Sequence, residues 1–505
     1  MQYGFVIDQR RCIGCHACTV ACKSENDVPV GDFRTWVKYS EVGNFPQVKR
    51  HFAVLRCNQC SNAPCVTICP VTALHKRDDG IVDLDRDVCI GCKACMQACP
   101  YDALYLNEDS GSAEKCHFCA HRTEQGLAPA CAVVCPEEAI IPGDFHDPNS
   151  KVSQLIREVD GAQVRRPEQG TRPNVWYLGA HSATIEPGTA AEPESWLWSD
   201  RRLPPPQFDP EDAERFQAPD TRVVLNSDHS IHWKWKVSAY LVTKGVAAGA
   251  AMWAPFAAFM PGGAFAQNYL PELLALIFTT LTTVLLVADL KRPTKFLSLV
   301  LRPNTKSWLV KGAWVLMAFS GLTTAVLLAR FLEFDELANG LRWTNLVPAS
   351  LAAAYTAFLF AQCEGRDLWQ RTNVLLPHLL VQALAVGAIT LLPFLPDPRL
   401  AVATFVLALA HHGLGLLERH GKHHTTNAQQ AAALMHTVKA WPGSRFSALH
   451  LGLAGSTAAA ILALFFVLGG TTTAAPLAVC ALLFWGGLFL YEQAYVRAGQ
   501  LPALS

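Results

Sequence analysis

The chain has 505 residues, which is more than one ordinary domain holds. Its formal net charge is zero and its pI is about 7.2, so no basic excess points to nucleic acid and no acidic excess points to a disordered chain. The residue types are unevenly spread: sixteen of the eighteen cysteines lie within residues 12–135, whereas most of the long apolar runs follow Trp235. We therefore expect two different halves.

The N-terminus reads MQYGFVIDQRRCIGC and reaches the first cysteine motif within a dozen residues. It contains no apolar h-region and no small-residue cleavage site, so it does not resemble a secretory signal peptide. We therefore expect the cysteine half to remain in a reducing compartment.

Four cysteine groups follow one another in this half. They are Cys12, Cys15, Cys18, Cys22; Cys57, Cys60, Cys65, Cys69; Cys89, Cys92, Cys95, Cys99; and Cys116, Cys119, Cys131, Cys135. The first and third groups have the spacing C-x2-C-x2-C-x3-C, the second widens one gap, and the fourth contains an insertion. Proline follows the last cysteine of three groups, whereas Lys23 follows the first.

This spacing is typical of cubane [4Fe–4S] clusters. Three thiolates on a tight loop cover one side of a cluster, and the fourth comes from elsewhere in the chain. Gly14 and Gly91 allow the loop backbone to wind closely and to aim N–H groups at sulfur. We expect the clusters to organise this half, because little apolar core remains among the loops.

Three alternatives compete with clusters. Eight disulfides would need an oxidising compartment, which the N-terminus argues against. Zinc accepts C-x2-C pairs, but zinc sites seldom show a triple C-x2-C-x2-C run. The segment from Cys12 to His16 also matches the C-x-x-C-H haem-attachment signature, although both of its cysteines already belong to a cluster run.

Four segments carry a resemblance to the iron–sulfur subunit of the dimethyl sulfoxide reductase family, over roughly residues 1–180. They are RCNQCSNAPCVTICPVTAL, DVCIGCKACMQACPYDA, EKCHFCAHRTEQGLAPACAVVCPEEAI and RRPEQGTRPNVWYLG. The resemblance implies an α+β ferredoxin-like domain built from two two-cluster units. It also implies a separate molybdopterin catalytic subunit, with molybdenum or tungsten, because the chain shows no molybdopterin-binding domain of its own.

The resemblance further implies that the cysteines cross between groups to form four clusters in a row. The four ligand sets would be Cys12, Cys15, Cys18 and Cys135; Cys22, Cys116, Cys119 and Cys131; Cys57, Cys60, Cys65 and Cys99; and Cys69, Cys89, Cys92 and Cys95.

A stretch rich in proline, glycine and charge separates the halves, at about residues 168–228. This composition is typical of an extended linker or of an arm laid on a partner, and a disordered spacer is the alternative for its central part. We predict a cluster domain at residues 1–160, an arm at 161–232 and a membrane domain at 233–505.

Eight apolar segments, each near 20 residues, predict an all-α bundle of eight transmembrane helices. The segments are 237–260, 270–289, 308–331, 343–363, 374–395, 400–418, 446–469 and 476–497. Eight spans return the C-terminus to the side of the cluster domain. The segments on that side carry 15 Lys and Arg residues, against Arg330, Arg342 and Arg399 in the short loops of the far side.

This positive-inside bias predicts a multi-pass protein of a bacterial-type inner membrane, with the cluster domain in the cytoplasm. Basic residues near the clusters could instead serve docking, and some relatives hold this subunit outside.

Ionisable residues crowd the cluster-side half of the membrane segments. Lys244 lies roughly 10 Å inside the first span, at 1.5 Å per residue. Asp289 ends the second span, Tyr355 lies in the fourth and His378 begins the fifth. Charged groups inside a membrane tend to mark function, and a quinone needs donors for its carbonyls and a route for two protons. Asp289 could instead cap a basic loop, Lys244 could snorkel, and Tyr355 could be a packing aromatic.

The tail resembles the polysulfide reductase-type (NrfD) membrane subunit, in KGVAAGA, VADLKRPTKFLSLVLRPNTKSWLVKGAW and AAAYTAFLFA. The resemblance implies that Asp289 and Tyr355 line a quinol pocket. A third polar contact of relatives falls on Val237 here, so Lys236, Tyr240 or Lys244 would have to replace it. We select Asp289, Tyr355, Lys244, Tyr240 and His378 as the candidate quinone residues.

A b-type haem between His378 and His411 or His412 is the main rival cofactor. We expect no haem, because members of the resembled family bind none.

We therefore expect an electron-transfer and membrane-anchor subunit that carries four [4Fe–4S] clusters, converts quinone and quinol on this chain, and passes electrons to or from the molybdopterin partner. A ferredoxin-fed quinone reductase or a redox-driven ion pump subunit is the alternative, and a passive anchor is a further one.

Overall fold

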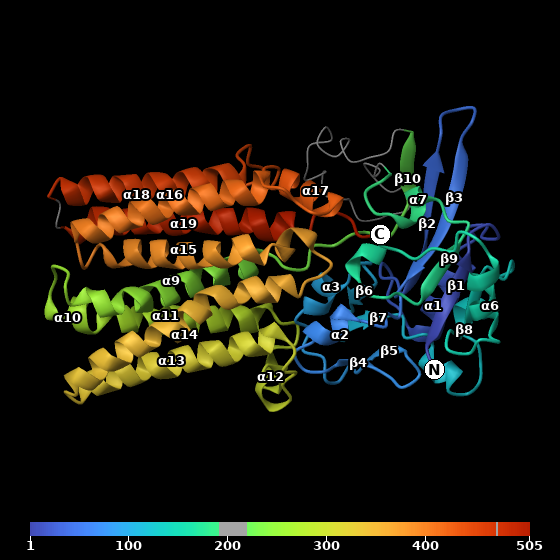
Figure 1. Cartoon of the computed structure of the whole chain (residues 1–505), viewed down its shortest axis with the longest axis horizontal. Helices are drawn as coiled ribbons and strands as arrows, with labels where there is room; N and C mark the ends of the chain where they lie inside the picture. The colour runs from blue at the N-terminus through green and yellow to red at the C-terminus, as the bar shows by residue number, and fades with distance from the viewer. Residues whose placement is uncertain (191–219, 471–472) are drawn as a thin grey trace.

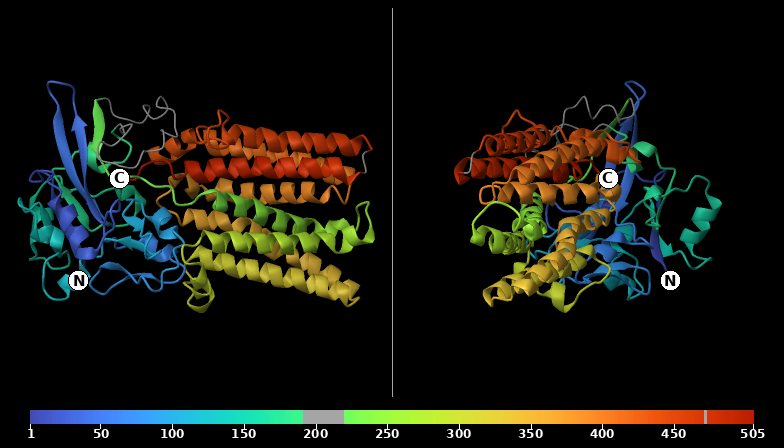
Figure 2. Two further views of the ribbon diagram at one scale, coloured as in Figure 1. Left: turned by 180° about the vertical axis from the view of Figure 1, so that it is seen from behind. Right: turned by 60° about the vertical axis from the view of Figure 1, so that its left-hand side comes forward.

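The computed structural model describes residues 1–190, 220–470 and 473–505, so the proline-rich centre of the predicted arm lies outside the described residues. A cluster domain of short strands and helices sits at one end of a long helical bundle (Figure 1). The view from behind shows the same end-to-end arrangement, with the N-terminus on the cluster domain (Figure 2).

Two three-stranded sheets lie on the side of the cluster domain away from the bundle (Figure 1). In the first, β1 (Tyr3–Asp8) pairs antiparallel with β8 (Ile140–Asp144) and parallel with β9 (Val175–Leu178). In the second, β2 (Thr35–Val42) pairs antiparallel with β3 (Lys49–Arg56) and with β10 (Thr221–Leu225). Both β9 and β10 come from the segment predicted as an arm, so its two ends are strands of the cluster domain.

Two smaller units of similar build lie between these sheets and the bundle. In each, a one-turn helix that carries cysteine precedes a two-stranded hairpin. The first unit has α2 (Pro64–Ile68), β4 (Leu74–Lys76) and β5 (Val82–Leu84), and the second has α3 (Ala94–Ala98), β6 (Leu104–Leu106) and β7 (Ala113–Lys115). The remaining helices of the domain are α1 (Ala17–Asn26), α4 (Ala120–Thr123), α5 (Ala130–Val133), α6 (Lys151–Glu158) and α7 (Ser182–Ile185). This architecture agrees with the predicted α+β ferredoxin-like domain.

The membrane domain is helical. Its long helices are α9 (Trp235–Ala257), α11 (Leu270–Asp289), α13 (Trp308–Phe331), α14 (Asp335–Ala361), α15 (Thr372–Leu391), α16 (Pro398–His420), α18 (Ala448–Leu468) and α19 (Ala474–Ala498). Short helices α10 (Ala264–Asn268), α12 (Ser298–Leu301) and α17 (Thr426–Leu434) lie in the connections.

Seven of these long helices in the described residues are long and apolar enough to span a membrane, not the eight that the sequence predicted. The exception is α9, because Lys236, Lys244 and several small residues lower its hydropathy. Neighbouring helices α11, α14, α15 and α19 pack around α9 and bury most of it. A helix shielded in this way does not need a lipid-facing apolar surface.

Two arginines differ from their predicted places. Arg330 and Arg342 were predicted in far-side loops, but Arg330 lies in the last turn of α13 and Arg342 lies inside α14, where it is buried. For Arg342 the reason is that α14 begins at Asp335, eight residues before the predicted apolar segment, so that Arg342 is helical and pairs with Glu272 inside the bundle.

The two domains share one apolar core. A single cluster of buried residues runs from Cys65 and Cys95 through Trp233 to Phe360 and Trp369 of the bundle end. After α19 the chain turns back, and the Gln500 side chain accepts from Trp233 N at 3.0 Å and from Gln97 at 2.8 Å. The cluster domain is therefore fixed against the bundle.

Candidate functional site

The sixteen cysteines of the cluster domain gather into four sets that correspond to the predicted crossed ligand sets. Set 1 (Cys12, Cys15, Cys18, Cys135), set 2 (Cys22, Cys116, Cys119, Cys131) and set 4 (Cys69, Cys89, Cys92, Cys95) each line their own cavity. In set 3 (Cys57, Cys60, Cys65, Cys99), Cys60 interacts electrostatically with the other three. All of these thiols are free.

Local backbone geometry explains how adjacent cysteines reach different sets. Gly14 and Gly91 adopt φ values of +73° and +68°, which L side chains rarely take, so each loop turns tightly before its short helix. In α1, Cys18 and Cys22 are one helical turn apart, and the first contributes to set 1 while the second contributes to set 2. Each short run of sequence thus serves two sites.

The sets follow one another as a line. Cys18 of set 1 is close enough to Cys131 of set 2 to interact electrostatically, and Cys57 of set 3 has the same relation to Cys116 of set 2. Cys95 of set 4 in turn interacts with Cys65 of set 3. Set 1 includes the exposed Cys15, whereas set 4 faces the bundle. The line therefore runs from the outer surface of the cluster domain to the membrane helices.

Burial disfavours the thiolate form of these cysteines in the absence of a bound cluster. Burial raises the pKa of Cys18 to about 11, although Arg56 opposes the shift and Cys131 adds to it. Burial, together with the negative charge of Cys69, raises the pKa of Cys92 to about 12. Thiolates at these positions need a positive centre to hold them.

Arg56 supplies positive charge between sets 1 and 2. It is fully buried, its Nη1 donates to Cys131 Sγ at 3.1 Å, and it interacts with Cys116 and Cys18. Its Nε and Nη2 have no hydrogen-bond partner among the described residues. Arg56 lines the cavity of set 2, and buried N–H groups at such a cavity fit anionic iron–sulfur clusters, whose sulfides accept hydrogen bonds.

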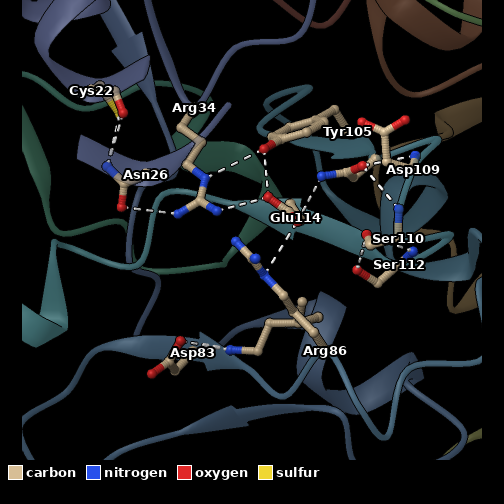
Figure 3. A network of polar contacts seen from close by, with 12 residues as sticks. Cys22, Asn26, Arg34, Asp83, Arg86, Tyr105, Asp109, Ser110, Ser112 and Glu114 are labelled. Atoms are coloured by element: carbon tan, nitrogen blue, oxygen red, sulfur yellow. Dashed lines mark hydrogen bonds and ion pairs between the residues drawn. The ribbon is translucent and has the colours of Figure 1, made fainter. Parts of the chain in front are cut away.

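A second polar network contacts set 2 (Figure 3). Asn26 Nδ2 lies 3.7 Å from Cys22 Sγ and 3.9 Å from Cys119 Sγ. Arg34 holds the other end of this amide at 3.2 Å and forms a buried ion pair with Glu114 at 2.7 Å. The ion pair fixes the amide so that its N–H groups point at sulfur, which is one way a protein tunes a cluster potential.

Set 4 is joined to the bundle by its own loop. Lys93, between Cys92 and Cys95 in sequence, donates through its Nζ to the Asp289 carboxylate and carbonyl, each at 2.8 Å. The Trp233 indole donates to Cys92 O at 3.4 Å, and Asn304 Nδ2 donates to Cys69 O at 2.8 Å. Asp289, a predicted quinone residue, is thus engaged with the cluster loop at the domain interface.

Three predicted quinone residues come together deeper in the bundle. The Lys244 ammonium lies 4.6 Å from the centre of the Tyr355 ring and 6.0 Å from that of Tyr240, and it donates to Thr356 Oγ1. All of these side chains are buried. Tyr355 lies against Gly312 of α13, where a Cβ would come within 2.3 Å of the ring. The packing therefore sets the Tyr355 ring beside Lys244.

His378 belongs to a neighbouring group. His378 Nε2 and His411 Nδ1 are 2.8 Å apart, and the Glu418 carboxylate is 3.0 Å from His378 Nδ1. An iron between the two imidazoles would need about 4 Å, taking metal–nitrogen bonds of about 2 Å. The hydrogen-bonded pair is therefore too close to ligate one haem as it stands.

Sequence reasoning missed one buried group at the far end of the bundle. Arg342 of α14 forms a two-point ion pair with Glu272 of α11, at 2.6 and 2.9 Å, and both residues are almost fully buried. The missed signal was Glu272 in the first turn of an otherwise apolar helix, since a carboxylate there needs a partner cation inside the protein.

Comparisons with known proteins agree with the division of the chain into a cluster domain and a membrane domain. Residues 48–145 match the family described as 4Fe-4S dicluster domain, and residues 223–496 match the family described as polysulphide reductase, NrfD.

Relatives of the cluster half are themselves components of reductases by name. A subunit of tetrathionate reductase from Salmonella typhimurium is 45% identical over 199 residues, which is 39% of this chain and 80% of the relative. A putative iron–sulfur subunit of dimethyl sulfoxide reductase from Halobacterium salinarum is 41% identical over 228 residues, 39% of this chain and 87% of the relative. A component of polysulfide reductase from Wolinella succinogenes is 37% identical over 190 residues, 37% of this chain and 98% of the relative.

The NrfD match covers more than half of the chain, and the relatives of the cluster half are covered over most of their length. The chain belongs to the NrfD polysulphide reductase family of multi-pass membrane proteins, fused to an electron-transfer subunit of the 4Fe-4S dicluster type.

Proposed function

We propose that this chain connects a separate molybdopterin catalytic subunit, holding molybdenum or tungsten, to the quinone pool. One observation carries the proposal: set 4, the last of the four cysteine sets, lies against the bundle end that also holds Lys244, Tyr240 and Tyr355. An electron donor and a site suited to a lipid-soluble acceptor are thus adjacent.

The four cysteine sets would hold four [4Fe–4S] clusters, which supply one-electron transfer along the line from set 1 to set 4. A cubane is larger than a single ion, so its thiolates stand around a cavity. In the described part of the chain, no three His, Cys, Asp or Glu side chains gather tightly enough for one metal ion. The cysteine-lined cavities and the unpartnered Arg56 nitrogens support the cluster assignment.

The protein residues would bind and orient the quinone head. The Lys244 ammonium can donate to one carbonyl oxygen, and the Tyr355 and Tyr240 hydroxyls can donate to the other or exchange a proton with it. Asp289, held by Lys93, would mark the rim of the pocket towards set 4. His378 contacts His411 and Glu418 and would not touch the quinone head directly.

Helix length and charge suggest how the chain crosses the membrane. We propose that α9 is an eighth span, since 23 residues extend about 35 Å at 1.5 Å per residue. The chain would then sit in a bacterial-type cytoplasmic membrane with its cluster domain in the cytoplasm, as the excess of Lys and Arg on the cluster side favours. The partner would dock near the exposed Cys15, at the outer end of the line.

The test uses the complex isolated through a tag on this chain. A short-chain quinol is mixed with the oxidised complex, and cluster reduction is followed by electron paramagnetic resonance. We expect Lys244→Met and Tyr355→Phe to slow this reduction at least tenfold while iron content is unchanged. Tyr269→Phe, before α11 at the far end, is the matched control and should behave as the wild type. A passive anchor, with quinone bound elsewhere, predicts wild-type rates in all three variants.

A further inference from the structure

Four ionisable side chains from three helices meet inside the cluster-side half of the bundle. They are His378 of α15, His411 and Glu418 of α16, and Tyr491 of α19, and none is more than 3% exposed. Besides the contacts of His378 with His411 and Glu418, Tyr491 Oη donates to the Glu418 carboxylate and lies 3.4 Å from His378 Nδ1. We call these four residues the histidine group.

The histidine group is not a closed set of satisfied hydrogen bonds. His411 Nε2 has no partner among the described residues, although it is fully buried, and Glu418 Oε1 approaches His378 without the alignment of a hydrogen bond. A static structural role would favour full satisfaction, because an unpartnered buried polar atom lowers the stability of the fold. Imidazole, carboxyl and phenol groups in contact can instead pass a proton between them.

The group continues towards the proposed quinone pocket. Gln382, one turn along α15, places its Nε2 at 3.4 Å from His378 Nε2 and also hydrogen-bonds Glu492 of α19. Glu492 in turn attracts Lys244 of α9 electrostatically. Side chains from α15, α19 and α9 thus connect the histidine group with the ammonium that lies over Tyr355.

The same group also leads to the surface on the cluster side. Glu418 lies two residues before the end of α16, and the connection that follows contains the exposed Lys422 and the half-buried His423. His423 is close enough to Glu418 and Arg371 to interact with their charges. The charged groups around Glu418 are therefore at the cluster-side end of the bundle.

We infer that the histidine group is a proton relay between the cluster-side aqueous phase and the quinone pocket. The inference rests on the proposed function. In the reducing direction, quinone takes two electrons from the clusters, its two carbonyl oxygens each gain a proton, and quinol forms. The two protons come from cluster-side water through Glu418, Tyr491 and His378. They then reach Glu492, whose charge interacts with that of Glu418, and pass on to Lys244, while the Gln382 amide orients His378 and Glu492 and carries no proton. The oxidising direction returns them along the same side chains.

The competing route would bring protons from the far side of the membrane. Two buried carboxylates lie at that end in the described residues: Glu272, which is held at two points by Arg342, and Asp397, which pairs with Arg399 at 2.7 Å. A carboxylate held in this way is a poor proton carrier, because protonating Glu272 would leave Arg342 buried without a charged partner. The geometry therefore favours exchange on the cluster side.

Two variants and a matched control test the relay in the whole complex. His378→Gln and Glu418→Gln keep size and hydrogen bonding but cannot carry a proton. His412→Gln is the control, because His412 is adjacent on α16 yet faces Thr457 of α18 at 3.0 Å. Turnover is measured with a short-chain quinol as electron donor and ferricyanide as electron acceptor, in light and heavy water, across pH 5.5 to 9, with iron content as the check on assembly.

We expect kcat to fall at least tenfold in both relay variants, with KM changed less than threefold and a larger solvent isotope effect. Glu418→Asp should restore part of the rate, and His412→Gln should stay within twofold of the wild type. Wild-type kcat and isotope effect in both relay variants would overturn the relay, as would a raised KM with unchanged kcat, which would place these residues in quinone binding. If His378→Gln fails to assemble, Glu418→Gln and Tyr491→Phe decide.

A second readout separates the relay from the pocket on which it rests. In vesicles with the cluster domain outside, a pH indicator reports on which side protons appear or vanish during turnover. Proton exchange outside supports the relay, whereas exchange inside overturns it and favours a pump. Failure of the wild-type complex to react with any quinol would instead overturn the pocket itself, and the relay with it.

Discussion

Arg56 offers a direct test of the line of clusters, because it is buried between sets 1 and 2. The positive charge should stabilise the reduced, more negative state of an adjacent cluster. Taking a separation of about 6 Å to the cluster centre and an effective dielectric constant of about 20, the interaction is about 2.8 kcal/mol. At 59 mV for a tenfold change, this corresponds to about 120 mV for a one-electron step.

We therefore expect Arg56→Gln to lower the reduction potential of the set 2 cluster by about 100 mV, measured by redox titration with electron paramagnetic resonance at low temperature. The set 1 cluster, near Cys18, should shift less, and sets 3 and 4 should hardly shift. Arg56→Lys keeps the charge and should stay within about 30 mV of the wild type. With iron content unchanged, shifts below 20 mV in the Gln variant, or equal shifts in all four clusters, would show that Arg56 does not set the potential of the set 2 cluster.

Three further predictions concern the pocket, the interface and the metal. Gly312→Ala should reduce quinone turnover at least tenfold, because the added Cβ would meet the Tyr355 ring at 2.3 Å, whereas Gly321→Ala on the same helix meets nothing within 4 Å and should be neutral in the same quinol assay. Asp289→Asn should slow quinol-driven cluster reduction with all clusters assembled, since it weakens the 2.8 Å ion pair to Lys93; unchanged stopped-flow kinetics would contradict this. Removing iron with a chelator and reductant should lower the unfolding temperature of the cluster domain by at least about 10 °C, while the helical signal of the bundle persists, because the buried thiolates would lose the positive centres that hold their loops together. Equal unfolding temperatures with and without iron would contradict this prediction, because the cluster domain would then be stable without its clusters.

The ferredoxin-like fold and the cluster type of the cysteine half could be predicted because the spacing of the cysteines is specific to [4Fe–4S] clusters. The three-residue gap between Cys95 and Cys99 is typical of a one-turn helix. Gly91 allows the tight turn that precedes this helix. The resemblance to an iron–sulfur subunit supplied the crossed sets, which spacing alone left open. The cavities of sets 1, 2 and 4 group the same cysteines.

The packing of the membrane half was harder to predict, because an apolar segment shows how long a helix is but not which helices it contacts. Lys244 could be read as a snorkelling residue, and only the packing of α9 in the bundle interior places it over Tyr355. The same limit explains why the sequence did not predict the low hydropathy of α9 among the spans or the pairing of Arg342 with Glu272, since both depend on which helix faces lie inside. His378 was selected for its depth. Its pairing with His411 entered only as a haem alternative, and its contacts with Glu418 and Tyr491 were not predicted.

We propose that this chain carries electrons between a molybdopterin partner and quinone. The metal content of the complex, isolated from native membranes through a tag on this chain, is the decisive measurement. We expect about sixteen iron atoms per chain, four for each cubane, and about one molybdenum or tungsten atom in a large co-purifying subunit. Sixteen iron atoms with neither metal, and no large partner, would contradict it and would favour a ferredoxin-fed quinone reductase.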